Sequence, residues 1–143
     1  MTHTCLQVYL HIIFATKDRE ALITPEIESR LYEYLGGIAR KRECVLLRIN
    51  GMDDHVHMLL KLHADTPIST LLKELKSYSS GWVKKQGNRE FSWQIGYAGY
   101  SCSITHVDPL IKYIDNQKQH HQTRTFDEEL AILNKMWGTS WNG

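Results

Sequence analysis

The chain has 143 residues, of which 42% are hydrophobic and 23% charged, and its formal net charge at pH 7 is +1. This length and composition are typical of a globular protein, and we expect residues 1–143 to form a single domain. The near-neutral charge excludes a surface that is basic throughout. A nucleic-acid interface would therefore need local clusters such as Arg40-Lys41-Arg42, although one such cluster is more often a solvated helix face.

The cysteines and the apolar segments of the chain indicate the cellular compartment in which the protein is expected. Cys5, Cys44 and Cys102 are far apart and have no CxxC spacing, so neither a disulfide framework nor a cysteine zinc site is expected. The N-terminal stretch lacks the basic region and cleavage site of a signal peptide, and no apolar run reaches the ~18 residues of a membrane span. We expect a cytoplasmic protein that does not enter a membrane.

The first half of the chain alternates strand and helix signals. Residues 6–15 are rich in β-branched and aromatic side chains, as in a strand, and Thr24-Pro25 then resembles an N-cap followed by proline at the first helical position. The helix after it carries one apolar stripe, formed by Ile27, Leu31, Tyr34, Leu35 and Ile38. Residues 44–50 and 55–62 are predicted to form a hairpin joined at the turn dipeptide Asn50-Gly51.

The second half repeats this alternation. Thr66-Pro67 gives another cap signal, and the helix that follows is predicted to end at Gly87-Asn88. Residues 97–104 are a fourth strand candidate, and Asp108-Pro109 caps a third helix that contains KYIDNQKQHH. The order βαββαβ plus a C-terminal helix predicts an α+β, ferredoxin-like fold, with an antiparallel sheet covered by two helices on one face.

The third strand carries two histidines in the stretch DDHVHMLL. Side chains alternate across a strand, so Val56 and Met58 are predicted to pack under the helices while His55 and His57 point together to the other face. Two neutral imidazoles on one face suit a divalent metal ion. The alternative is the polar outer face of a half-exposed strand, which is the more common meaning of an isolated HxH pattern.

The predicted third helix carries a second group of polar residues. Tyr113 and Gln117 are four residues apart, so they lie one turn apart on the same helical face. Taken singly, Tyr113 is an ordinary amphipathic aromatic and Gln117 a solvated amide. His120 and His121 follow directly, and we interpret them as helix-end or DNA-backbone contacts before metal ligands.

Other polar and aromatic residues have less specific interpretations. Asp54 either orients His55 or ends the turn before it. His11 and His63 are interpreted as structural. Tyr97 and Tyr100 alternate with small residues and suit either stacking on unpaired bases or ordinary sheet packing.

Together these motifs resemble the single-tyrosine HUH transposases, the TnpA type of bacterial insertion sequences and their repeat-associated relatives. The resemblance covers nearly the whole chain. It runs through HIIFATKDRE, DDHVHMLL, LKELKSYSS, WQIGYAGYSCS and YIDNQKQHHQTRTF. It implies one HUH transposase catalytic domain over residues 1–143, with His55, His57 and Gln117 as metal ligands and Tyr113 as the nucleophile.

The resemblance also implies a reaction. Such proteins cut and rejoin single-stranded DNA at the ends of a mobile element, recognise imperfect hairpins there, and pair as homodimers with composite active sites. Tyrosine attacks the scissile phosphorus to give a 5′-phosphotyrosine and a free 3′-hydroxyl, which suits a residue whose phenolate is a better leaving group than an alkoxide. A divalent metal, Mg²⁺ or Mn²⁺, polarises the phosphate.

Two other functions stay open. The first is a domesticated or inactive relative that binds DNA hairpins without cutting them. The second is an unrelated ferredoxin-like hydrolase that uses His55 and His57 with water as the nucleophile. The intact Tyr113 favours the transposase over both alternatives.

Overall fold

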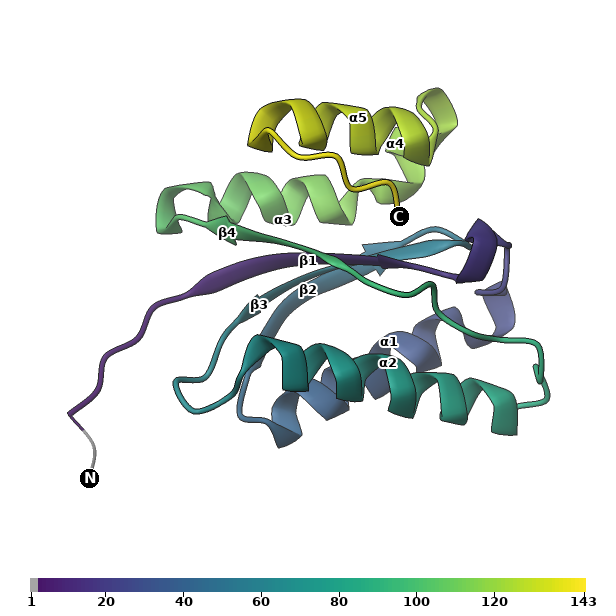
Figure 1. Cartoon of the computed structure of the whole chain (residues 1–143), viewed down its shortest axis with the longest axis horizontal. Helices are drawn as coiled ribbons and strands as arrows, with labels where there is room; N and C mark the ends of the chain where they lie inside the picture. The colour runs from purple at the N-terminus through teal and green to yellow at the C-terminus, as the bar shows by residue number, and fades with distance from the viewer. Residues whose placement is uncertain (1–2) are drawn as a thin grey trace.

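A computed structural model describes residues 3–143. Within that range, four strands form one antiparallel sheet in the order β2-β3-β1-β4 (Figure 1). The strands are β1 (Tyr9–Ala15), β2 (Val45–Gly51), β3 (His55–Lys61) and β4 (Ala98–Cys102). This order, combined with the helices below, confirms the predicted α+β, ferredoxin-like fold.

The main core lies between the sheet and two helices, α1 (Pro25–Lys41) and α2 (Ile68–Lys85), which cover the same face (Figure 1). Both helices turn a stripe of apolar side chains toward the sheet, because residues three or four apart share one helical face. Fully buried residues of this core include Leu31, Leu35 and Leu71 from the helices and Met58 and Leu60 from β3. Tyr34 departs from the predicted stripe, since it is partly exposed and stacks on Trp82.

Three helices cover the opposite face: α3 (Val107–Asp115), α4 (Gln117–Thr123) and α5 (Phe126–Trp137). Short 3-10 turns, η1 (Lys17–Arg19) and η2 (Ile104–His106), precede α1 and α3. The predicted third helix is divided at Asn116 into α3 and α4. α5 lies outside the predicted elements; it begins with a capping box between Thr125 and Glu128.

The hairpin between β2 and β3 is present, but its turn is not where the sequence predicts. Asn50 and Gly51 belong to β2, and the chain turns over residues 52–54. Gly51 is needed for close approach, because a Cβ atom there would lie 2.9 Å from the Cα of Val56. The register of this edge strand against β3 shifts between Leu46 and Arg48.

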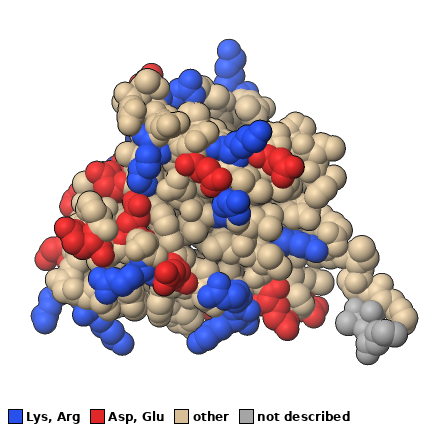
Figure 2. Space-filling model, turned by 180° about the vertical axis from the view of Figure 1, so that it is seen from behind, with Lys and Arg blue, Asp and Glu red and all other residues tan. Residues whose placement is uncertain are grey.

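Charges on the surface are mixed in sign. On the face shown in Figure 2, Lys and Arg side chains are interspersed with Asp and Glu side chains. Within residues 3–143, none of the helices has the length and apolarity needed to cross a membrane.

Candidate active site

His55 and His57 project from β3 into the space beneath α4 and α5, and each has 0% of its surface exposed. Their neighbours Val56 and Met58 pack on the other side of the sheet, in the core under α1 and α2. The predicted alternation of faces is therefore correct. Complete burial excludes the alternative of a half-exposed polar strand face and requires a polar partner for every ring nitrogen.

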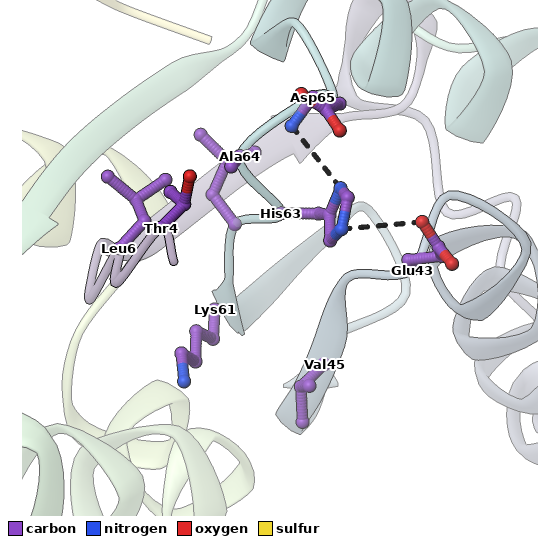
Figure 3. A pocket seen from close by; sticks show the side chains of 9 residues that line it. Thr4, Leu6, Glu43, Val45, Lys61, His63, Ala64 and Asp65 are labelled. Atoms are coloured by element: carbon purple, nitrogen blue, oxygen red, sulfur yellow. Dashed lines mark hydrogen bonds and ion pairs between the residues drawn. The ribbon is translucent and has the colours of Figure 1, made fainter. Parts of the chain in front are cut away.

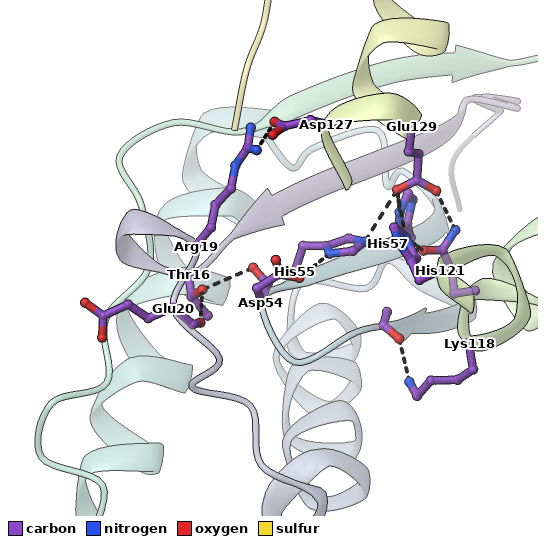
Figure 4. A network of polar contacts seen from close by, with 12 residues as sticks. Thr16, Arg19, Glu20, Asp54, His55, His57, Lys118, His121, Asp127 and Glu129 are labelled. Carbon is purple, nitrogen blue, oxygen red and sulfur yellow. Dashed lines mark hydrogen bonds and ion pairs between the residues drawn. The ribbon is translucent and has the colours of Figure 1, made fainter. Parts of the chain in front are cut away.

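Each of the two histidines is oriented by another side chain. Asp54 Oδ1 lies 2.7 Å from His55 Nδ1, and His11 Nε2 lies 2.8 Å from His57 Nδ1. The ring of Phe126 also stacks on His55, with 3.8 Å between centroids. These contacts leave the Nε2 atoms of both histidines facing the centre of the site (Figure 4). His11, predicted to be structural, is thus a direct support of His57.

Gln117 enters the site as the first residue of α4 and is fully buried. Its Oε1 lies 3.3 Å from His55 Nε2 and 3.2 Å from His121 Nε2. Lys118 joins α4 to two other elements, because its Nζ lies 3.2 Å from Asn50 Oδ1 on β2 and 3.1 Å from Glu28 Oε2 on α1.

Glu129, on α5, joins these groups and was not predicted. The side chain is buried, and its Oε1 lies 3.1 Å from His57 Nε2, 3.4 Å from His55 Nε2 and 3.3 Å from His121 Nε2. Its Oε2 accepts a hydrogen bond of 2.9 Å from Gln117 Nε2. Figure 4 shows the carboxylate pointing from α5 into the histidine cluster.

Tyr113, on α3, is half-buried beside the same cluster. Its hydroxyl donates a hydrogen bond to Glu129 Oε2, and its ring centroid lies 5.7 Å from that of His57. Tyr113, Gln117 and both strand histidines therefore meet within a single chain, although they come from three elements of the fold.

The buried setting fixes the charge of the main groups. Burial opposes ionisation of Glu129, but hydrogen bonds from His55 and His57 outweigh it and hold its pKa well below the usual range. Burial lowers the pKa of His57 to about 4 and that of His11 to about 3. Burial and the neighbouring Glu129 charge raise the pKa of Tyr113. The site therefore combines a carboxylate, a neutral His57 and a protonated phenol.

The donor atoms at the centre fit a divalent metal ion. His55 Nδ1–H donates to Asp54 Oδ1, so Nε2 faces the oxygens of Gln117 and Glu129. Burial opposes protonation of His55, but hydrogen bonds to Asp54 and Glu129 outweigh it and raise its pKa. A positive charge is therefore favoured between these oxygens, either on the protonated ring or on an ion bound at Nε2. Glu129 Oε1 lies 3.1 Å from His57 Nε2 and 3.4 Å from His55 Nε2. These separations agree with the roughly 3.0–3.5 Å expected between ligand atoms that are bonded at ~2.0–2.2 Å to one ion. His55, His121 and Glu129 form a second group that could hold a metal ion, with ligand atoms all within 4.8 Å of one another.

His63 has no part in this cluster. It lies in a separate pocket near the start of β2, where its Nε2 is 3.3 Å from Glu43 Oε2 and its Nδ1 accepts a hydrogen bond from the Asp65 amide (Figure 3).

A ferredoxin-like sheet with two buried histidines on an inner strand, faced by a tyrosine and a glutamine from the following helices, defines the class of single-tyrosine HUH proteins. The family described as "Transposase IS200 like" matches residues 4–117, which is most of the chain. The chain belongs to this family of transposases. Glu129 and the whole of α5 lie beyond the matched residues.

Solved structures agree with this assignment. The chain is similar to a crystal structure of a candidate transposase from Deinococcus radiodurans R1, with 25% identity and a TM-score of 0.64, over 82% of this chain and 95% of that one. It shares its fold with a REP-associated tyrosine transposase bound to a REP hairpin, with 13% identity and a TM-score of 0.66, over 100% of this chain and 90% of that one. Among curated proteins, none matches the sequence closely enough to count as a relative.

Proposed function

We propose that this transposase cleaves and rejoins single-stranded DNA at the ends of an insertion sequence, with Tyr113 as the nucleophile. One observation carries the proposal: the Tyr113 hydroxyl lies in the same buried cluster as the HUH histidines and Gln117. The Tyr113 hydroxyl and the Gln117 amide share the Glu129 carboxylate, and Gln117 itself contacts His55.

In the proposed reaction, the phenolic oxygen of Tyr113 attacks the scissile phosphorus. The new bond joins Tyr113 to the 5′-phosphate, the bond to the 3′-oxygen breaks, and the free 3′-hydroxyl is available for the reverse attack that rejoins DNA. Before the attack the Tyr113 hydroxyl donates a hydrogen bond to Glu129 Oε2, which orients it. The phenolic proton passes to water as the bond to phosphorus forms, and the departing 3′-oxygen takes a proton from water. His55 and His57 are held in place on an inner strand by Asp54 and His11, so their Nε2 atoms are positioned before the phosphate binds.

His55, His57 and Gln117 are the residues that we propose to hold the metal, Mg²⁺ or Mn²⁺. When bound, the ion polarises a phosphate oxygen and stabilises the charge of the transition state. Binding at His57 Nε2 requires the tautomer in which Nδ1–H donates to His11 Nε2, which the 2.8 Å contact already allows. Glu129 adds negative charge beside these three neutral ligands, so the ion would be less electrophilic than with neutral ligands alone.

The partners follow from the same proposal. We propose a DNA hairpin at the element ends as the bound substrate; one solved structure of the same fold is bound to a REP hairpin. We also propose a homodimer with composite sites. The edge strands available for pairing are β2 and β4, because β3 and β1 lie between them in the sheet.

The decisive experiment incubates the protein with labelled single-stranded hairpin oligonucleotides and Mn²⁺, and resolves the products on a denaturing gel. A covalent protein–DNA adduct supports the proposed chemistry. Retarded migration on a native gel without an adduct would identify a hairpin-binding relative, and cleavage without an adduct would identify water as the nucleophile.

A further inference from the structure

A groove of about 570 Å³ opens next to the proposed nucleophile, between β4, α3 and α5. Tyr113, Glu129 and His11 line it on the side of the histidine cluster, so the groove is continuous with the candidate active site. Its volume falls within the range of roughly 300–1,000 Å³ that is usual for small-ligand sites. That volume suits a single nucleotide better than a duplex.

The walls of the groove are apolar and partly aromatic. Trp137 stacks on Tyr100, with 5.2 Å between ring centroids and 25° between ring planes, and the indole remains 43% exposed. Met136, also in the groove, is 70% exposed. Leaving such apolar area in water is unfavourable. A planar apolar ligand would therefore gain by covering it.

The groove also offers groups for the polar parts of a nucleotide. Arg124 lines it, acts electrostatically on the Tyr113 hydroxyl, and makes no hydrogen bond or ion pair within residues 3–143. An uncommitted guanidinium at this place suits a phosphate. Ser103 and His106, which share a 2.8 Å hydrogen bond, also line the groove and can meet the edge of a base.

Building on the function proposed above, we infer that this groove binds an unpaired nucleobase adjacent to the phosphate that Tyr113 attacks. Trp137 supplies the stacking platform and Arg124 contacts the backbone. A neutral peptide or a second copy of this chain would cover the apolar walls as well, but neither has a use for an arginine placed beside a nucleophile. One wall of the groove is formed by α5, which lies outside the matched family residues.

The test uses the Tyr113→Phe variant, which separates binding from cutting, and a fluorescein-labelled ten-nucleotide single strand of mixed sequence. Adding Trp137→Ala should weaken binding, measured by fluorescence anisotropy, by roughly 5- to 150-fold, the equivalent of losing one base–aromatic stack. Trp137→Phe should retain most of the affinity. Trp82→Ala is the matched control, because Trp82 lies on α2, on the other side of the sheet.

A second measurement locates the base. An abasic site moved along the oligonucleotide should weaken binding most at one position, and that penalty should disappear in Trp137→Ala, as expected for two groups in direct contact. Circular dichroism checks that each variant is folded.

The outcomes separate this inference from the proposed function. Equal binding by Trp137→Ala and its parent, no binding of the single strand at all, or a change in oligomeric state without a change in DNA affinity would each overturn the groove assignment. If Trp137 matters for binding but the wild type forms no adduct with any hairpin, the groove stands and the proposed chemistry fails.

Discussion

Glu129 Oε1 lies 3.1 Å from His57 Nε2, although 72 residues separate them in the chain. Through its other oxygen, the same carboxylate accepts the hydroxyl hydrogen bond of Tyr113. One side chain of α5 therefore connects the proposed nucleophile with the histidine strand, and several expectations depend on this connection.

Replacing Tyr113 with Phe should abolish the covalent protein–DNA adduct and leave hairpin affinity nearly unchanged, because the change removes one hydroxyl and no charge. Denaturing gels measure the adduct, and fluorescence anisotropy measures binding. Tyr97→Phe serves as the control and should form the adduct normally. An adduct formed by the Tyr113 variant would direct attention to Tyr97 and Tyr100 as nucleophiles.

The double variant His55→Ala/His57→Ala should lose both cleavage and tight Mn²⁺ binding, since it removes two of the three proposed ligands. Gln117→Ala should keep part of the activity and require more metal. Electron paramagnetic resonance of free Mn²⁺ gives the affinities independently of activity. Cleavage at the wild-type rate by the double variant in the presence of a chelator would refute a metal-dependent mechanism.

Glu129→Gln tests whether the carboxylate strengthens metal binding. The substitution keeps the size of the side chain but removes its charge, and we expect Mn²⁺ affinity to fall by roughly 10- to 100-fold, as for other groups that support a metal site. Glu128→Gln is the neighbouring control, because Gln also completes a capping box. A gain in affinity would instead mean that the carboxylate competes with the ion's other ligands.

Mixing inactive chains tests the proposed composite sites. If the helices of one chain complete the histidine site of its partner, then Tyr113→Phe mixed with His55→Ala/His57→Ala should regain adduct formation. Analytical ultracentrifugation should show a dimer. A monomer at micromolar concentration would contradict the proposal. A dimer whose mixed variants form no adduct would mean that each active site is built from one chain, as the contacts of Glu129 with Tyr113 and Gln117 within a single chain permit.

Glu74 and Arg42 form a two-point ion pair between α2 and the end of α1, with 2.6 Å between Arg42 Nε and Glu74 Oε1. The hydrogen bonds and charge of Arg42 lower the pKa of Glu74. A lowered pKa means that the stabilisation is present at neutral pH and is lost as the pH falls through the folded-state value. Glu74→Gln should therefore lower the melting temperature slightly at pH 7, and the difference should shrink below about pH 4 in calorimetric scans.

The alternation of Val56 and Met58 with His55 and His57 was predictable because the period of a strand alone separates its two faces. Glu129 was not, because it follows Asp127 and Glu128 in the first turn of a helix, where acidic residues already have a local explanation. Only the packing of α5 on the sheet shows that, of these three acidic residues, Glu129 is the one that is buried in the site. His11 was missed for a related reason, since its partner His57 is 46 residues away.

The Asn50-Gly51 dipeptide shows how a correct residue can support a wrong interpretation. Glycine favours turns through its freedom of φ, but Gly51 is used for its missing side chain, which lets β2 approach the backbone of β3. The sequence is the same for either use, and only the tertiary contact separates them.

The two faces of the sheet are completed at different stages of synthesis. The core under α1 and α2 draws on buried residues from Leu10 to Trp93, whereas the candidate site needs Tyr113, Gln117 and Glu129. Chains fold as they emerge from the ribosome, with N-terminal parts first. A growing chain could thus bury its main core before it holds a nucleophile, so the ability to cut DNA would arise only when α3 and α4 have emerged and docked on the sheet.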